Sequence, residues 1–247
     1  MSLVIVGLGP GDLALLAPRA AAALAEATDL IGYGPYLDRL PHVPGQTRHS
    51  SDNRVELDRA RHALGMAAAG HRVAVVSAGD AGVFGMAAAV FEAVEAVPEW
   101  AALDIEVVPG ISALLAAAAR LGAPLGHDFC AISLSDNLKP WNVVLERLRA
   151  AATAGFVITL YNPVSRARPW QLGAAFEALR ELLPGDTQMA FATAISRHDE
   201  AVCVTTLAEA RSEQADMRTL VLVGTAATRR LLRPGQAPWL YTPRSLI

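Results

Sequence analysis

The sequence predicts an α/β protein with two domains, at residues 1–121 and 122–247. In the first part, apolar runs rich in β-branched residues alternate with alanine-rich helical segments, which is typical of a parallel sheet connected by helices. In the second part strands predominate, and two of them, at 187–195 and 201–205, follow each other closely, so we expect a mixed sheet. Glycine and proline at 122–126 mark the boundary.

Hydrophobic periodicity and turn residues place the elements of the first part. We expect strands at 3–7, 30–33, 72–77 and 104–108, and helices at 13–27, 55–69, 86–97 and from 113 to about 122. Residues 34–53, which are rich in proline and polar side chains, are expected to form a long loop. Long polar loops in compact domains are often functional.

The second part is divided in the same way. We expect strands at 129–136, 155–161, 187–195, 201–205 and, last in the chain, 219–223. Helices are expected at 141–154, with Asn137 as a candidate N-cap, and at 169–183, with one helical turn at 207–210.

Composition excludes several classes of protein. The formal net charge of −3 over 247 residues argues against nucleic acid or an anionic membrane as the main partner. No apolar run reaches the roughly 18 residues that cross a bilayer, and the first residues resemble no leader, so we expect a cytoplasmic protein. The two cysteines, Cys130 and Cys203, form no CxxC pair, and the six histidines show no ligand spacing, so we expect no metal site.

The first strand ends in Gly7-Leu8-Gly9-Pro10-Gly11-Asp12. This turn differs from a dinucleotide fingerprint, because Pro10 and Gly11 stand where a helix should already run and Asp12 adds a negative charge. A structural turn without a ligand remains an alternative. An NAD(P) oxidoreductase is a second alternative, but it should carry an acidic residue after the second strand, where this chain has Gly32-Tyr33-Gly34.

Two further glycine loops follow strands, at 78–85 and 109–113. Ligands of open α/β sheets bind at the carboxyl ends of the strands, so three such loops favour a binding site there. The sequence contains neither a Gly-x-Ser-x-Gly elbow nor a P-loop. Methyl transfer from S-adenosylmethionine (SAM) suits such a site, because the sulfonium is already activated and positioning supplies most of the rate.

Together the three loops resemble the signature loops of the tetrapyrrole (corrin/porphyrin) methyltransferases, and the resemblance extends over the whole chain. It implies the two-domain tetrapyrrole methylase fold, with a mostly parallel first sheet, a mixed second sheet and an active-site cleft between the domains. It also implies a homodimer that uses SAM and releases S-adenosyl-L-homocysteine. One departure is Ala81, where many members have proline.

Motifs outside the three loops narrow the expectation within the family. They are similar to those of members that methylate carbon 17 of precorrin-3B and contract the ring to precorrin-4, in cobalamin (vitamin B12) biosynthesis. The motifs are Gly32-Tyr33-Gly34-Pro35-Tyr36, Gly126-His127-Asp128-Phe129, Ser133-Leu134-Ser135-Asp136, Pro140-Trp141 and Leu160-Tyr161-Asn162-Pro163 with Ser165 and Arg168. Some relatives carry an extra Fe–S-bearing domain. Because this sequence has only two cysteines, we expect the plain type, which acts on a metal-free hydroxylactone substrate.

The resemblance also implies site residues. The expected cofactor-binding residues are Gly9, Pro10, Gly79, Asp80, Val83, Phe84, Ser112, Ala113, Tyr161, Asn162, Ala194, Gly224, Thr225 and Ala226. The expected substrate-binding residues are Tyr33, Arg48, Ser133, Ser135, Arg166 and Arg168, and the loop arginines Arg54 and Arg197 also suit the carboxylates of a macrocycle.

Ring contraction requires the loss of a hydroxyl proton, so one acid–base group is expected. Asp80 is the first candidate, and His49, Asp136 and Tyr161 are the others. A sister methyltransferase acting at another ring carbon, an oxidoreductase and a tetrapyrrole-binding protein without catalysis remain alternatives.

Overall fold

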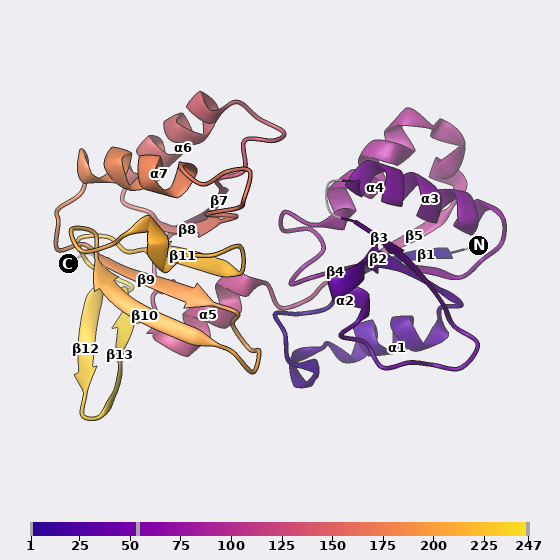
Figure 1. Cartoon of the computed structure of the whole chain (residues 1–247), viewed down its shortest axis with the longest axis horizontal. Helices are drawn as coiled ribbons and strands as arrows, with labels where there is room; N and C mark the ends of the chain where they lie inside the picture. Colours follow the sequence, from indigo (N-terminus) through magenta and orange to yellow (C-terminus); the bar gives the residue numbers. More distant parts are fainter. Residues whose placement is uncertain (1, 53–54, 246–247) are drawn as a thin grey trace. The chain divides into compact units, whose positions relative to one another are not determined.

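The computed structural model describes residues 2–52 and 55–245. Arg54, one of the arginines expected at the substrate, lies outside the described residues. The chain divides into two compact units, Met1–Ala113 and Leu114–Ile247, and each is described by itself (Figure 1).

The first unit is built on one five-stranded parallel sheet with the order β3-β2-β4-β1-β5. Its elements are β1 (Ser2–Gly7), the 3-10 helix η1 (Leu13–Leu15), α1 (Pro18–Glu26), β2 (Asp29–Tyr33), α2 (Gly34–Leu37), β3 (Thr47–Ser51), α3 (Glu56–Ala68), β4 (Val73–Ser77), α4 (Met86–Ala96), the 3-10 helix η2 (Pro98–Ala102) and β5 (Asp104–Val108). Because all five strands run the same way, their carboxyl ends lie at one edge of the sheet.

Both faces of this sheet are covered by helices, as Figure 1 shows. Side chains alternate along a strand, so Leu3 and Ile5 of β1 pack against α3 and α4, whereas Val6 packs with α1 and α2. This double burial explains why β1 and β4 are almost continuous runs of apolar residues.

The second unit contains a five-stranded mixed sheet with the order β10-β9-β11-β8-β7 and a small sheet with the order β12-β13-β6. Its elements are α5 (Ala113–Leu121), β6 (Gly122–Ala123), β7 (Phe129–Ser133), α6 (Trp141–Thr153), β8 (Val157–Tyr161), α7 (Gln171–Arg180), β9 (Gln188–Thr193), β10 (Ala201–Thr206), the 3-10 helix η3 (Ser212–Gln214), β11 (Thr219–Val223), β12 (Arg229–Arg233) and β13 (Gln236–Tyr241). Only β7 and β8 pair in parallel within the larger sheet.

Helices α6 and α7 cover one face of this larger sheet and α5 lies on the other (Figure 1). Leu114 and Ala117 of α5 pack with Ala192, Ile195 and Leu220. Helix α5 therefore belongs to the second unit, whereas the sequence assigns it to the first domain, and the division lies at the start of this helix instead of its end.

Two segments of the first unit differ from the expectation. The helix expected at 13–27 is divided, because Ala17 is extended and α1 begins only at Pro18, whose fixed φ suits a first helical position. The loop expected at 34–53 contains α2 and the edge strand β3. The sequence of β3, Thr-Arg-His-Ser-Ser, is polar throughout and lacks the alternation that identifies a strand.

The second unit differs at its end. The chain does not finish with β11, because β12 and β13 form a hairpin after it, with Gly235 in the turn at a φ of 68°. The arginines of β12 and the proline within β13 hide this hairpin from a sequence reading. Asn137 does not cap α6, whose N-cap is Pro140. Residues 122–123, expected as part of a linker, form β6 and pair with β13.

Among the described residues, no helix combines the length and apolar character needed to span a lipid bilayer.

Candidate functional site

The three glycine loops follow three neighbouring strands. Strand β1 lies between β4 and β5, so the loops after these strands leave the same edge of the sheet side by side. The first two loops are joined directly: the backbone N–H of Gly9 donates to the carbonyl of Gly79 at 3.0 Å, and the N–H of Gly79 donates to the carbonyl of Gly9 at 2.9 Å. Both glycines have positive φ values, 73° and 64°, which explains the residue type.

The loops also touch backbone to backbone. A Cβ placed on Gly110 would lie 2.3 Å from the carbonyl oxygen of Gly79 and 2.7 Å from that of Gly7. A Cβ on Gly7 would lie 2.6 Å from the backbone nitrogen of Gly110. The loops approach this closely only because these residues have no side chain.

Asp80 fixes the second loop to the third. One carboxylate oxygen, Oδ1, accepts a hydrogen bond from the backbone N–H of Gly82 at 2.8 Å. The other, Oδ2, accepts one from the backbone N–H of Gly110 at 3.0 Å. Both oxygens thus hold the main chain, which gives Asp80 a structural task besides any chemical one.

The chemistry of this edge fits a compact ligand with a positive centre. The three loops contain no lysine or arginine to balance a phosphate charge, and they carry Asp12 and Asp80, whose negative charge disfavours a pyrophosphate. Pro10 and Ser112 are buried, and Val83 is half-buried. Phe84 is 52% exposed and provides an apolar surface beside the glycines. The sulfonium of SAM carries the opposite, positive charge, and the flat face of its adenine ring is apolar.

Phe84 is also strained. Its φ is 52°, in the left-handed region that residues other than glycine and asparagine avoid. The other non-glycine residues with positive φ in the described chain are Asn162, Ala194 and Ser196. Strain of this kind gathers at ligand sites, and three of these four residues are among the expected cofactor-binding positions.

The second unit brings several expected residues together at the carboxyl ends of β7 and β8. Ser133 and Tyr161 are partners in the register of these parallel strands. The Oγ of Ser133 accepts hydrogen bonds from the side-chain Nδ2 of Asn162 at 2.9 Å and from the backbone N–H of Ser135 at 3.3 Å. The Tyr161 hydroxyl accepts the backbone N–H of Leu114, which follows the third glycine loop in the chain, at 3.0 Å.

Asp136 and Arg168 extend this group. The Oδ2 of Asp136 accepts a hydrogen bond from the side-chain Nε2 of Gln171 at 3.1 Å. Arg168 donates from Nη1 to the carbonyl of Asn162 at 3.1 Å. Arg166 is exposed in the same loop, whereas Arg197 follows β9 and its backbone N–H donates to the carbonyl of Ala194 at 3.0 Å.

The cofactor position expected at 224–226 does not join this group. Strand β11 is antiparallel to both β8 and β9, so its end at Val223 pairs with Ile158 and Met189, near the beginnings of those strands. Gly224, Thr225 and Ala226 therefore lie at the opposite edge of the sheet from Tyr161. Ala194 follows β9 and its backbone N–H bonds to the carbonyl of Arg218, which places Ala194 at the edge of Tyr161.

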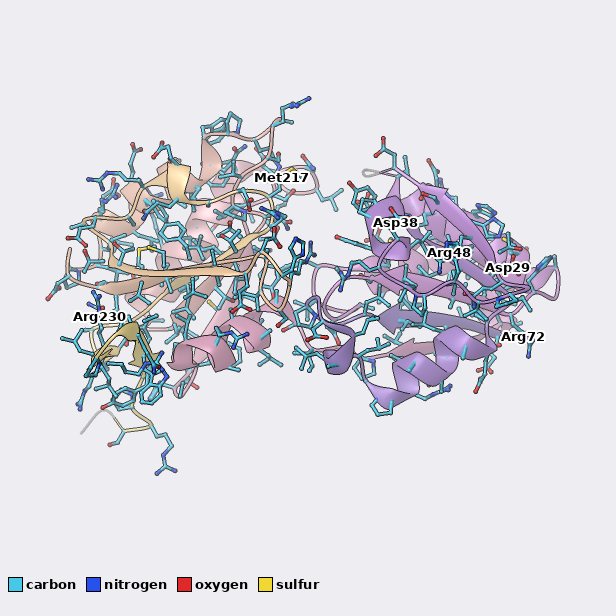
Figure 2. The ribbon with its side chains drawn as sticks, turned by 60° about the horizontal axis from the view of Figure 1, so that its bottom comes forward. Asp29, Asp38, Arg48, Arg72, Met217 and Arg230 are labelled. Atoms are coloured by element: carbon cyan, nitrogen blue, oxygen red, sulfur yellow. The ribbon has the colours of Figure 1, made fainter. Side chains whose placement is uncertain are left out.

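His49, an expected acid–base candidate, contacts Asp29 at the other end of the first sheet. Its Nε2 lies 2.9 Å from Oδ1 of Asp29, and Nδ1 of His71 lies 3.0 Å from Oδ2. Asp29 begins β2, and in Figure 2 it lies beside Arg72, just before β4. This is the amino edge of the sheet, so the structure does not bring His49 to the glycine loops.

Asp29 is an unusually acidic carboxyl group. Burial alone would raise its pKa, but hydrogen bonds from His49, Thr28 and His71 outweigh burial and bring the pKa to about 2. Asp29 is 5% exposed, and its carboxylate joins the segments before β2 and β4 to β3.

Arg48, expected at the substrate, is occupied by the main chain. Its guanidinium donates to the carbonyls of Leu37 and Leu40, each at 2.9 Å, and to that of Pro41 at 2.6 Å. Arg48, labelled in Figure 2, thereby fixes the segment after α2. Tyr33, at the carboxyl end of β2, lines a surface pocket of about 400 Å³ together with residues 34, 35 and 50–52.

Two residues that the sequence did not single out support these sites. Gln171 is 1% exposed and holds Asp136. Arg59 is 6% exposed and donates to the hydroxyl of Ser51 at 2.7 Å and to the carbonyl of Asp52 at 2.6 Å, behind the Tyr33 pocket. A polar residue on the buried side of a helix is the signal that identifies both.

Across residues 2–52 and 55–245, no three His, Cys, Asp or Glu side chains converge on a point where a metal ion could bind.

Comparison with known proteins identifies the family. Residues 2–211 match the Tetrapyrrole (Corrin/Porphyrin) Methylases. A precorrin-3B C(17)-methyltransferase from a Sinorhizobium species is 56% identical over 98% of this chain and 96% of its own length. The cobalamin biosynthesis protein CobIJ of Mycobacterium tuberculosis H37Rv is 47% identical over 98% of this chain, which matches 48% of CobIJ.

The crystal structure of the methyltransferase CobJ is 55% identical and superposes with a TM-score of 0.94, covering 98% of this chain and 99% of CobJ. The glycine loops after β4, β1 and β5 are consistent with these matches. The chain belongs to the tetrapyrrole (corrin/porphyrin) methylases.

Proposed function

We propose that the chain is a SAM-dependent C-methyltransferase that methylates carbon 17 of precorrin-3B and contracts the ring to precorrin-4, in cobalamin biosynthesis. The single observation that carries the substrate is the 56% identity, over 98% of this chain, to an enzyme named for that reaction. The edge formed by the three glycine loops supports the cofactor, because it combines backbone groups, small residues and negative charge.

In this proposal the cofactor-binding residues are Gly9, Pro10, Gly79, Asp80, Val83, Phe84, Ser112 and Ala113, together with Tyr161, Asn162 and Ala194. When bound there, SAM would supply an activated methyl group to the nucleophilic ring carbon, with its thioether as the leaving group. The loops accelerate this step by orientation, which is worth several kcal/mol when two reactants are held in line.

The polar groups of the second unit receive the macrocycle. In the proposal its carboxylates are bound by Ser133, Ser135, Arg166 and Arg168, and Tyr33 is a further substrate-binding residue. Arg48 is omitted, because its guanidinium is engaged by three carbonyls. In the proposal the enzyme is cytoplasmic and acts as a homodimer. Sedimentation of the purified protein tests whether it is a dimer.

Calorimetry separates the proposed class from an oxidoreductase. SAM and S-adenosyl-L-homocysteine should each bind at one site per chain, and NADH should not bind. Binding of NADH without binding of SAM would overturn the proposal. Mass spectrometry of the product distinguishes the sister reaction, since a methylated but uncontracted ring would exclude precorrin-4 as the product.

A further inference from the structure

The two carboxylates expected at the site are held in different ways. Both oxygens of Asp80 accept backbone N–H groups, of Gly82 and Gly110. Asp136 is half-buried and only its Oδ2 is held, by the side chain of Gln171 at 3.1 Å. Within the described part of the chain, Oδ1 of Asp136 has no hydrogen-bond partner. Asp136 therefore has a fixed orientation and one oxygen available for a proton.

Gln171 is built into the protein at a cost. It is 1% exposed, and its Oε1 has no hydrogen-bond partner among the described residues. An unpaired buried amide oxygen destabilises a fold, because it has lost its hydrogen bonds to water without replacement. Leucine would avoid that cost at the start of α7, beside the buried Leu172 and Ala175. The amide of Gln171 provides a hydrogen bond to Asp136 that leucine could not make.

The surroundings of Asp136 are those of a substrate site. Asp136 follows β7, three residues after Ser133. The Oγ of Ser133 accepts a hydrogen bond from the side chain of Asn162, at the end of β8. Parallel pairing of β7 and β8 brings these polar residues to one edge. The acid–base group that ring contraction requires would stand among hydroxyl and amide groups that recognise the same macrocycle.

We propose that Asp136 accepts the hydroxyl proton lost in ring contraction and that Gln171 is the residue that positions it. This inference rests on the proposed function. The O–H bond breaks and its electron pair becomes the C=O bond, while a C–C bond of the same carbon migrates with its electron pair to an adjacent electron-poor ring carbon. The proton goes to Oδ1 of Asp136, and its loss removes the positive charge that methyl transfer brought to the ring. Asp80 then serves to hold the cofactor loops.

Four variants of the full chain test this assignment in single-turnover reactions with SAM and precorrin-3B, followed by mass spectrometry across a range of pH. Asp136→Asn should slow ring contraction about 100-fold or more, the usual effect of losing a general base. Gln171→Leu should slow it about 10-fold at unchanged SAM affinity. Gln171→Glu places a second carboxylate beside Asp136 and should shift the acidic limb of the profile to higher pH.

Gln188→Leu is the matched control. Gln188 also has a side-chain oxygen that is buried and unpaired among the described residues, but its backbone carbonyl bonds Gly224 at the opposite edge of the sheet. This variant should contract the ring at the wild-type rate.

Contraction by Asp136→Asn at the wild-type rate and with the wild-type pH profile would overturn the role of Asp136. Equal behaviour of Gln171→Leu and Gln188→Leu would overturn the role of Gln171. A wild-type protein that forms no methylated product would instead overturn the proposed function, and the inference with it.

Discussion

The carboxylate of Asp80 accepts the backbone N–H of Gly110 at 3.0 Å and so ties the loop after β4 to the loop after β5. Strand β1, with its own glycine loop, lies between these two strands. The hydrogen bond therefore closes a ring of three loops that the proposed cofactor site needs in one fixed arrangement.

Asp80→Asn should weaken SAM binding about tenfold or more and still permit ring contraction at saturating SAM. The amide retains one acceptor oxygen but turns an NH₂ group toward a backbone N–H, and hydrogen bonds to charged groups contribute about 1.5–3 kcal/mol. Calorimetry and product analysis at high SAM measure the two effects separately. Wild-type affinity combined with lost contraction would indicate that Asp80 is the base.

Gly110→Ala should destabilise the protein by about 1–3 kcal/mol, as overpacking does, because the new Cβ meets the carbonyl oxygens of Gly79 and Gly7. Gly65→Ala is the control, since Gly65 lies in α3 with nothing within 4 Å of the added carbon. It should stabilise the protein by about 0.5–1 kcal/mol. Urea denaturation measures both, and equal midpoints for the two variants would contradict the close packing of the loops.

Asp29 should make stability depend on pH below about 4. Its pKa is lowered from 3.8 to about 2 in the folded protein, so its contribution is fully present above the unfolded-state pKa and is lost as pH falls through the folded-state value. The contribution is on the order of 2 kcal/mol. The free energy of unfolding of the wild type should therefore exceed that of Asp29→Asn near pH 6, and the difference should shrink between about pH 4 and 2.

Asp58→Asn provides the comparison, because Asp58 has a side chain that is 75% exposed. Its effect should be small at every pH. If the difference in the free energy of unfolding between wild type and Asp29→Asn stays constant down to pH 2, the pKa of the Asp29 carboxyl is not lowered in the folded protein.

Thr225→Val should leave SAM affinity within about twofold of the wild type, whereas Tyr161→Phe should reduce it about fivefold. Thr225 follows the far end of β11, and its Oγ1 accepts the backbone N–H of Ala227 within its own turn. Tyr161→Phe removes the acceptor of the Leu114 N–H at the start of α5, and one such bond is worth about 1 kcal/mol. The reverse order of effects in calorimetry would restore 224–226 to the cofactor site.

The sequence allowed the glycine loops and their common edge to be predicted, because a parallel sheet collects the carboxyl ends of its strands whatever their order. It did not allow the placement of Gly224 to be predicted, since that depends on the direction of β11 within a mixed sheet. Strand β3 escaped detection because its five residues are polar and its pairing with β2, not its pattern, makes it a strand.

Individual contacts explain the remaining differences at the site. Arg48 has a side chain suited to substrate binding, but in the structure it donates to neighbouring carbonyls. His49 has a side chain suited to acid–base chemistry, but it contacts Asp29. Gln171 carries no chemical signature in the sequence, and its relation to Asp136 spans 35 residues and exists only in the fold.

The most direct test of the proposed function uses SAM labelled with ¹³C in its methyl group, precorrin-3B and the purified protein. One labelled methyl group should appear in the NMR spectrum of the product on saturated carbon 17, within a contracted ring of the mass of precorrin-4. A label on any other ring carbon, or at carbon 17 of a ring that has not contracted, would contradict it.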